Sequence, residues 1–466
     1  MPATDEAILA ARQRTASLGD LARIAARAAF AVLLVLSPFR AQIELLARPI
    51  PPVYSDFTDL LLFWSDIAAL VTLAAWLVSL IAEPRPIGTG PRFVTLPLAG
   101  LVVVAAIGVP FSLDPGLAAV QAIHLAGLAL LGLYVLNEVR LRDLVGPVSI
   151  MVAIQAAVAI AQVLGQHSIG LPALGELDLR PDQSVSVVTD GAGVRLLRGY
   201  GLSDHPNILG GLLAAGLLLV GGWFVTLERP ARQRRQLALA VVFAIGTAGL
   251  FLTFSRSAWL AFGAGLVVAA LVVRSTGTSA SIRRPGALVA VGALAAAPLL
   301  IAFLPWVLAR TGTQGAIATE TRSVVERVAV GDVSLDVALA HPLVGVGIGV
   351  LPEAMALAQP EFAYDVQPAS LVPLDAAAET GILGAVLLVL AMIAPWVALG
   401  RRRLAATAEL AIASAMLAVV TVVGLFDYYT WTYEPGRIWL WITFGLWAAA
   451  YVRATRSDST PVPHAG

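Results

Sequence analysis

The sequence contains neither cysteine nor lysine, and only 13% of its 466 residues are charged. Without cysteine, a thiol nucleophile, a disulfide and a cysteine-ligated metal are all excluded. Without lysine, Schiff-base chemistry and a lysine phosphate cradle are excluded as well, and all thirty basic residues are arginine. The sequence also lacks an HExxH zinc motif, a P-loop and a GxGxxG fingerprint, so we expect no metal site and no cofactor.

Apolar residues make up 58% of the chain and gather in long blocks. Soluble domains have about 45–50% apolar residues, and a membrane-spanning helix needs about 20 in a row. The sequence therefore predicts an all-α fold, a polytopic transmembrane helical bundle of about twelve spans. The predicted spans are 27–46, 60–82, 93–112, 117–138, 144–164, 206–226, 236–254, 256–273, 286–306, 379–399, 404–425 and 437–453.

Arginine is unevenly distributed among the predicted loops. With the N-terminus placed in the cytoplasm, twenty of the thirty arginines fall on the cytoplasmic side, including the clusters LERPARQRRQ and GRRRL. Basic residues in short loops are retained on that side of the membrane. We therefore predict a multi-pass membrane protein with both termini in the cytoplasm. The net charge of zero favours no nucleic-acid partner.

These spans divide the chain into five predicted regions. Two outer loops are unusually long, and loops of such length usually carry function or are disordered. The predicted regions are a cytoplasmic N-terminal segment at 1–26, spans 1–9 at 27–306 with an outer loop at 165–205, an extracytoplasmic loop domain at 307–378, spans 10–12 at 379–453, and a cytoplasmic tail at 454–466.

Two stretches place arginine on the predicted outer side, next to a span. RGYGLSDHPNILGG contains Arg198 and His205 and leads into the sixth span. It is either an ordinary helix cap or an anion site, in which arginine offers a planar fork to phosphate oxygens. LTFSRSAWL places Arg256 in a very short outer turn. Arg256 either extends to the lipid headgroups or binds a ligand. Because basic residues usually lie on the cytoplasmic side and Arg256 does not, it is our first candidate.

The longest outer loop carries further charged candidates. Arg322, Glu326 and Arg327 have the spacing of ion pairs on a helix surface, which is the simpler interpretation. A glycine-rich turn, HPLVGVGIG, follows them and begins with His341. At the end of the loop, Asp375 either caps the helix of the tenth span or acts as a base.

The last candidate stretch is GLFDYYTWTYEPGRIWLW, near the twelfth span. Its aromatic residues are typical of an interfacial belt, and aromatic faces also suit sugar rings. Asp427 stands at the outer end of the eleventh span, where Arg437 is near enough in sequence to be its partner. His124 falls inside a predicted span and is interpreted as a hydrogen-bonded packing residue.

These stretches, in this order, resemble the O-antigen ligase and O-antigen polymerase family of bacterial envelope glycosyltransferases. The resemblance covers roughly residues 195–445. The matching segments are an arginine with an HPN entry at 198–211, a Ser-Arg turn at 255–256, Arg327, the glycine turn at 341–349 and the AETG segment at 378–384.

The resemblance implies a GT-C-like bundle with a large extracytoplasmic loop between spans 9 and 10. It implies a metal-independent glycosyltransferase of the bacterial inner membrane that transfers or polymerises glycan from an undecaprenyl-diphosphate carrier at the outer leaflet. The acceptor is then a glycan, a lipid or a protein. With no metal and no lysine, arginine is left to stabilise the diphosphate leaving group. The expected catalytic residues are Arg256, Arg327 and Asp375, and the expected substrate-binding residues are Arg198, His205, Arg322, His341 and Asp427.

One position departs from the family pattern. Ligase-like members have a histidine about nine residues before Glu379, and here that residue is Ser370. A serine hydroxyl is no base near neutral pH. Either Asp365 or Asp375 serves instead, or this branch needs no such histidine, or the chain is an inactive relative in a polysaccharide assembly complex. A polytopic transporter or flippase of envelope glycan is a further alternative, although carriers usually have their longest connection in the cytoplasm.

Overall fold

The computed structural model describes residues 17–227, 233–274, 285–312, 318–401 and 407–458. Long helices dominate these residues, as the apolar blocks of the sequence predict. The longer helices are α2 (Leu18–Leu36), α4 (Trp64–Ala82), α5 (Arg92–Gly108), α6 (Pro115–Glu138), α7 (Leu141–Gly165), α8 (Pro206–Thr226), α9 (Gln233–Leu252), α10 (Arg256–Arg274), α11 (Pro285–Ala302), α13 (Ala318–Ala340), α15 (Val372–Arg401), α16 (Ala408–Gly424) and α18 (Glu434–Asp458).

Short elements connect these helices at one end of the bundle. They are α3 (Ser55–Thr58), α12 (Leu304–Thr311), α14 (Leu351–Ala358) and α17 (Tyr429–Thr432), with the 3-10 turns η1 (Val109–Phe111) and η2 (Pro172–Leu174). Two antiparallel hairpins complete the set: β1 (Gln42–Leu46) pairs with β2 (Leu60–Phe63), and β3 (Val187–Thr189) pairs with β4 (Arg195–Leu197).

The predicted membrane bundle is confirmed. Eight described helices are long and apolar enough to cross a membrane, and a ninth span results if α11 and α12 are counted together across their 90° bend. Of the other three predicted spans, 404–425 and 437–453 fall largely on α16 and α18, whereas 27–46 overlaps α2 only as far as Leu36 and ends in β1. Of these, α16 has only 17 residues, and α2 and α18 have charged residues within them. The chain is thus a polytopic helical membrane protein.

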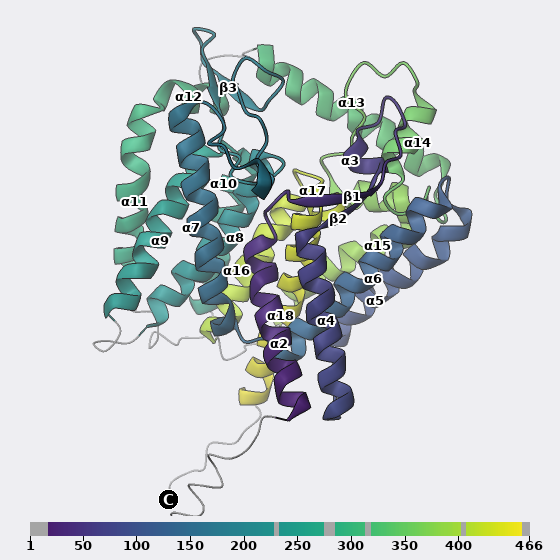
Figure 1. The fold of residues 1–466 in the computed structure, drawn as a ribbon, viewed down its shortest axis with the longest axis vertical. Coiled ribbons are helices and arrows are strands. Elements are labelled where there is room, and N and C mark those ends of the chain that lie inside the picture. The colour runs from purple at the N-terminus through teal and green to yellow at the C-terminus, as the bar shows by residue number, and fades with distance from the viewer. Residues whose placement is uncertain (1–16, 228–232, 275–284, 313–317, 402–406, 459–466) are drawn as a thin grey trace, which may run out of the picture.

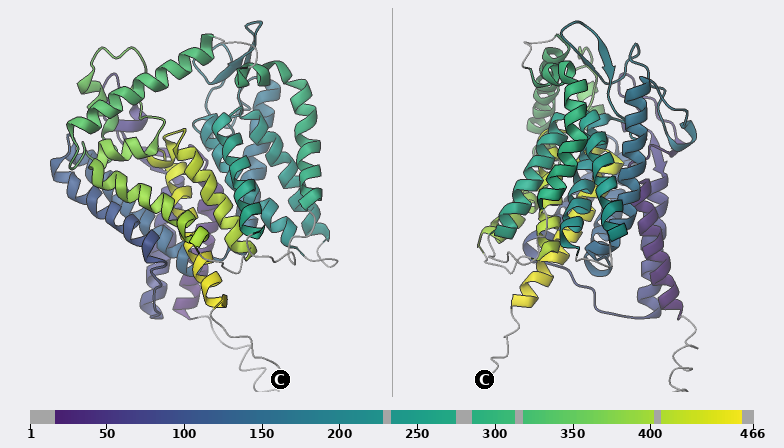
Figure 2. Two further views of the ribbon diagram at one scale, coloured as in Figure 1. Left: turned by 180° about the vertical axis from the view of Figure 1, so that it is seen from behind. Right: turned by 90° about the vertical axis from the view of Figure 1, so that its left-hand side faces the viewer.

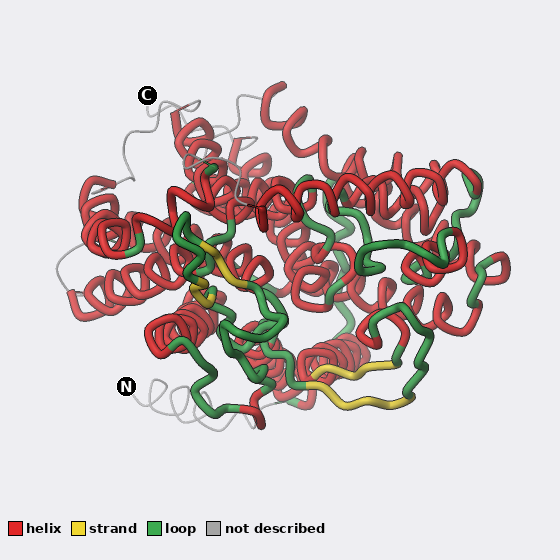
Figure 3. Tube along the Cα trace, turned by 90° about the horizontal axis from the view of Figure 1, so that it is seen from above, coloured by secondary structure: helices red, strands yellow, loops and turns green. Residues whose placement is uncertain are grey.

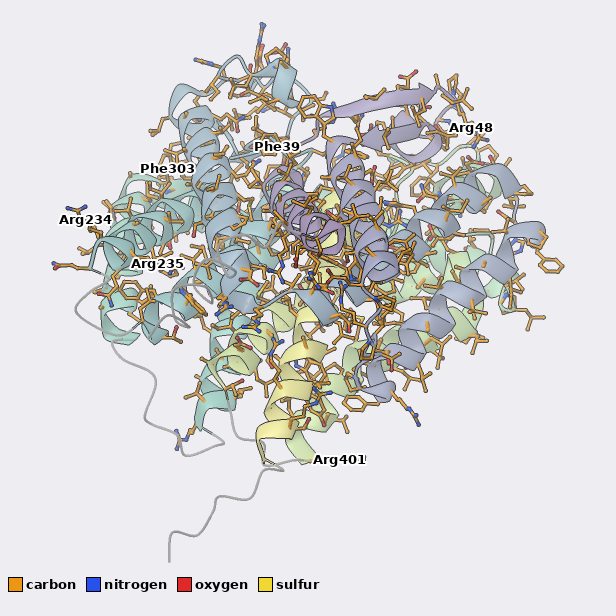
Figure 4. The ribbon with its side chains drawn as sticks, turned by 60° about the horizontal axis from the view of Figure 1, so that its bottom comes forward. Phe39, Arg48, Arg234, Arg235, Phe303 and Arg401 are labelled. Atoms are coloured by element: carbon orange, nitrogen blue, oxygen red, sulfur yellow. The ribbon has the colours of Figure 1, made fainter. Side chains whose placement is uncertain are left out.

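The two ends of the helical bundle differ in what lies there. In Figure 1 the chain enters α2 and leaves α18 at the bottom, whereas β1, β2, β3, α3, α13, α14 and α17 gather at the top. Arg234 and Arg235, at the start of α9, and Arg401, at the end of α15, project from the outside of the bundle (Figure 4). These three belong to the two arginine clusters of the sequence.

The top end is a layer of loops and short elements. Seen from above, the two hairpins and the green loops lie across the ends of the helices (Figure 3). The predicted loop at 307–378 contains much helix, because α13 runs across the top in Figure 1 and in the left view of Figure 2, and α14 follows it. The apolar face of α13 packs there, with Val330, Val333 and Val337 in a small core that also includes Leu351 of α14.

Two glycine-containing segments lock this layer to the bundle. The turn at 341–349 bonds to a break in α15, where Gly381 has φ 71° and ψ 177°. Val346 N donates to Ala378 O at 2.8 Å, and Ile382 N donates to Pro342 O at 2.9 Å. A Cβ on Gly345, whose φ is also 71°, would lie 2.3 Å from the carbonyl carbon of Glu379. The backbones approach so closely that only glycine fits.

The core of the bundle centres on α8. Eighty-three per cent of its most apolar 18-residue segment is buried inside the protein, and α18 is buried from Glu434 to Tyr451. Continuous apolar sequence is what a helix surrounded by other helices requires. The first residues of α8 therefore stand on a rigid base directly beneath the layer of loops.

Candidate functional site

A polar cavity of about 810 Å³ lies between the start of α8 and the layer of loops. Its walls come from the segment before α8, the β3 region, α12, α13 and the turn that contains α17. The charged side chains of the described residues that line it are Arg40, Asp56, Asp178, Arg198, Asp204, Arg310, Glu326, Arg327, Asp365 and Asp427. Four of the eight residues expected from the sequence line this cavity, namely Arg198, His205, Arg327 and Asp427.

Arg198 is held rigidly at the bottom of the cavity. Only 3% of the residue is exposed, and its guanidinium donates to Thr253 O at 2.7 Å, Ser186 Oγ at 2.7 Å and Asn207 Oδ1 at 2.6 Å. These three acceptors are neutral and fix the position of the guanidinium. Donors held in a fixed position are preorganised for an anion.

His205 caps the α8 helix and stays neutral. Its Nδ1 accepts the backbone N–H of Asn207 at 3.1 Å, so the ring proton lies on Nε2. Burial lowers the pKa of His205 well below its usual value, and the positive charges of Arg198, Arg310 and Arg327 lower it further. The helix-cap interpretation is therefore correct for this residue, which at the same time presents an N–H donor.

Asp427 is joined to Arg198 through one amide. Asn207 accepts from Arg198 and donates from Nδ2 to Asp427 Oδ2 at 2.8 Å. The second carboxylate oxygen accepts Tyr428 N at 3.0 Å. Burial raises the pKa of Asp427, although Arg327 and Asn207 oppose this shift. The sequence indicated Arg437 as the partner of Asp427, but Arg437 donates to Gln121 instead, at 2.6 Å.

Arg310 is a cavity residue that the sequence did not single out. It lies at the end of α12, after the 90° bend from α11, and only 7% of it is exposed. Its Nε donates to Phe254 O at 3.0 Å. In the sequence it was one arginine among ten on the predicted outer side, with no neighbouring motif. Only the bend of the helix brings it to the site.

Arg256, the first candidate from the sequence, is not among the cavity-lining residues. It is partly buried at the start of α10, and its Nη1 donates to the carbonyl oxygen of Arg310 at 3.3 Å. Arg256 thus contacts the segment that carries Arg310.

Arg327 extends into the cavity from α13 and is exposed there. None of the hydrogen bonds or ion pairs within the described part of the chain involves its guanidinium, which leaves all its donors for a ligand. Arg322, one and a half turns earlier on the same helix, is also exposed but does not line the cavity.

Asp375 and His341 lie outside the cavity lining. Asp375 is fully buried in the first turn of α15, where its Oδ1 accepts Ala369 N at 2.8 Å and thus holds the backbone just before Ser370. His341 is exposed at the end of α13, where the glycine turn begins. Ser370 does not line the cavity either.

A second group of cavity residues combines tyrosines with carboxylates. Asp204 pairs with Arg40, and burial raises the pKa of Asp204 to about 6. Tyr428 and Tyr433 contact each other with ring centroids 6.0 Å apart. The sequence pointed to aromatic residues here, but not to the partners that the fold supplies.

Glu326 and Asp365 bring two more carboxyl groups to this second group. Burial and the nearby charge of Asp365 raise the pKa of Glu326, while Arg322 and Arg327 oppose the shift. Burial and the nearby carboxyl group of Asp365 raise the pKa of Tyr54 to about 12.

A separate buried cluster contains His124. Its Nε2 lies 3.1 Å from Asp66 Oδ1 and 3.0 Å from Glu434 Oε2, and these three ligand atoms are close enough together to hold a metal ion. The contact confirms His124 as a hydrogen-bonded packing residue. These three residues lie on three different helices and are far apart in the sequence. They therefore form no sequence motif from which the cluster could be predicted.

Comparison with known proteins supports the resemblance found in the motifs. Residues 239–389 match the family described as O-antigen ligase. No curated protein matches the chain. The matched segment contains Arg310, Glu326, Arg327 and Asp365, whereas Arg198, His205 and Asp427 of the same cavity lie outside it.

Proposed function

Because the chain carries an O-antigen ligase domain, with the membrane glycan processing that this family performs, we propose that it transfers or polymerises glycan from an undecaprenyl-diphosphate carrier. The reaction takes place in the polar cavity. In this proposal the cavity end of the bundle faces the outside of the bacterial inner membrane, both termini are cytoplasmic, and 307–378 forms the extracytoplasmic loop domain.

One observation carries this proposal: three guanidinium groups share a cavity next to the N-terminus of a buried helix. Arg198 and Arg310 are buried and fixed by carbonyl oxygens, and Arg327 is exposed. The positive charges of all three lower the pKa of His205, so all three guanidinium groups lie near this histidine. A diphosphate leaving group gains negative charge as its bond to the sugar breaks, and fixed donors stabilise that charge without reorganising.

The arrangement assigns different tasks to these residues. Arg198, Arg310 and the Nε2–H of His205 bind the diphosphate of the bound carrier, and Arg327 completes the site from above. Arg256 then acts through the Arg310 segment, which it contacts, rather than on the substrate. The donors present are sufficient for charge stabilisation by a metal-independent route.

Replacing Arg327 with alanine tests the proposal. In a strain that lacks the chromosomal copy, we expect R327A and R310A to lower glycan transfer by about 100-fold or more, the usual effect of losing one such donor. The readout is the glycan ladder on a gel, normalised to the amount of protein in the membrane.

The chain offers a matched control on the same helix. Arg322→Ala removes the same kind of exposed arginine from α13 but leaves the cavity lining intact. R322A should retain normal ladders. Normal ladders from R327A and R310A would contradict the proposal, as would equal losses in all three variants.

A further inference from the structure

The cavity contains several carboxylates, and the chain has Ser370 at the position of the family histidine. Transfer of a glycan needs the acceptor hydroxyl to lose its proton as it attacks, and a carboxylate near that hydroxyl performs this task well. Six carboxylates of the described residues line the cavity: Asp56, Asp178, Asp204, Glu326, Asp365 and Asp427. Their contacts distinguish one of these carboxylates from the other five.

Most of these carboxylates are already engaged. Asp204 and Asp56 contact Arg40, and Asp178 lies 3.6 Å from Arg180. Both oxygens of Asp427 accept hydrogen bonds, from Asn207 and from the backbone of Tyr428. Asp365 is exposed to solvent, whereas Glu326 is partly buried. Arginines or hydrogen-bond donors thus already contact oxygens of four of these groups, Asp56, Asp178, Asp204 and Asp427.

Glu326 differs from them in geometry. Its hydrogen bond within the described chain is a long one, with Gln367 Nε2 donating to Oε1 at 3.3 Å. Gln367 is in turn held by Tyr428, whose hydroxyl donates to Gln367 Oε1 at 3.0 Å. Glu326 is thus oriented from one side, its other oxygen stays available, and it directly precedes Arg327 on α13.

The surroundings of Glu326 suit a sugar. Tyr428 and Tyr433 present aromatic rings, and Phe57 supports both from behind with centroids at 6.4 and 5.7 Å. Aromatic faces pack against the C–H faces of sugar rings, and carboxylates accept bonds from hydroxyl groups. Beside Tyr433, the carboxylates of Asp56 and Asp204 outnumber the one guanidinium of Arg40, so this wall of the cavity disfavours an acidic sugar.

We propose that Glu326 is the base that deprotonates the acceptor, and that the acceptor is a neutral saccharide bound beside Tyr428 and Tyr433. The inference rests on the proposed function. The acceptor oxygen forms a bond to C1 of the donor sugar as the bond from C1 to the diphosphate oxygen breaks. The hydroxyl proton passes to Glu326, and the electron pair of the broken bond leaves with the polyprenyl diphosphate.

The charged groups around Glu326 determine the pH dependence. Asp365 faces it from the loop before α15, Tyr54 from the segment before α3, and Arg322 and Arg327 lie on its own helix. Burial and Asp365 together raise the pKa of Glu326 above its usual value. A base works only when deprotonated, so transfer should fall on acidification at a higher pH than an ordinary glutamate would give.

The test uses the purified full-length protein added to membrane vesicles from the deletion strain, which contain the natural donor and acceptor. Binding of the carrier to the donor site is measured separately, as the change in melting temperature of the protein (the thermal shift) that undecaprenyl diphosphate produces. We expect Glu326→Gln to lower transfer by about 100-fold or more, to lose the acidic limb of the pH profile, and to keep the thermal shift. Asp332→Asn, an exposed carboxylate on α13 outside the cavity, is the control and should change neither.

The outcomes separate this inference from the proposed function. If R327A keeps both transfer and the thermal shift, the proposed function fails. If R327A loses both while E326Q transfers glycan at the normal rate, only the assignment of Glu326 fails. Should E326Q not reach the membrane, Glu326→Asp replaces it: a lower rate with a displaced acidic limb supports the base, and an unchanged profile overturns it.

Discussion

At the scale of single residues, one amide connects the two kinds of charge in the cavity. Asn207 accepts from the guanidinium of Arg198 and donates to the carboxylate of Asp427, and only 7% of it is exposed. An amide is the side chain that satisfies both neighbours at once, because it has a donor and an acceptor at one end. Asn207 therefore keeps Arg198 and Asp427 apart while fixing both.

Replacing Asn207 with leucine should break this connection. The variant leaves a buried donor of Arg198 and a buried oxygen of Asp427 without their bonds, at a cost of about 1–3 kcal/mol for each unsatisfied group. We expect a lower melting temperature of the purified protein and a large loss of glycan transfer. Asn207→Asp serves as a comparison, since its carboxylate still accepts from Arg198 but faces Asp427 with like charge. Wild-type transfer by N207L would mean that Arg198 needs no such support.

Residue types predicted part of this site. Arg198, His205, Arg327 and Asp427 were expected from the sequence because each stands beside a predicted helix end or within the long outer loop. Arg310 and Glu326 could not be selected in the same way. Arg310 enters the cavity through a bend that no residue pattern marks, and Glu326 has the spacing of an ordinary ion pair on a helix surface.

At the scale of elements, the two glycine segments form one joint between α13 and α15. Backbone bonds at 2.8–3.0 Å connect the turn at 341–349 to the break in α15, and Gly345 and Gly381 face the opposite backbone. The sequence presented the glycine turn and the AETG segment as two motifs with candidate site residues. In the structure the two segments pack against each other, and neither His341 nor Asp375 lines the cavity.

A methyl group at this joint should be poorly tolerated. The Cβ of Gly381→Ala would lie 2.3 Å from Leu343 O, and the φ of 71° is strained for alanine. We expect G381A to lower the melting temperature and the yield of folded protein. Gly331→Ala is the matched control: nothing lies within 4 Å of its Cβ, and alanine in a helix interior is favoured over glycine by about 0.5–1 kcal/mol. G331A should be as stable as the wild type or more so, and equal behaviour of the two variants would contradict this account.

At the scale of the whole molecule, the sequence predicted the helices better than their directions. Each of the twelve apolar blocks overlaps a helix, because bilayer length and apolar composition leave few other structures, but the block at 27–46 ends in β1 and the block at 60–82 begins with β2. The break in α15, the bend after α11 and the helical content of 307–378 depend on contacts between distant segments. Such contacts have no local signal in the sequence.

The absence of cysteine makes the orientation of the whole molecule easy to test. Ser323 lines the cavity from α13, and S323C introduces the single thiol of the chain. In intact cells we expect a membrane-impermeant maleimide to label S323C without permeabilisation of the inner membrane. A cysteine in place of Thr407, at the start of α16 and at the other end of the bundle, should be labelled only after permeabilisation. The reverse pattern would overturn both the orientation and the location of the site.

The burial of α8 has a consequence for how a large substrate enters. The floor of the cavity includes the start of α8, a span that is buried over most of its length, so it cannot yield without disrupting the core. The roof includes α13, much of whose surface between residues 321 and 329 is exposed. Segments with few buried contacts open at the lowest free energy. Amide hydrogen exchange should therefore be slow in α8 and fast in the first half of α13. A large substrate would then enter by movement of this half of α13, while α8 stays in place.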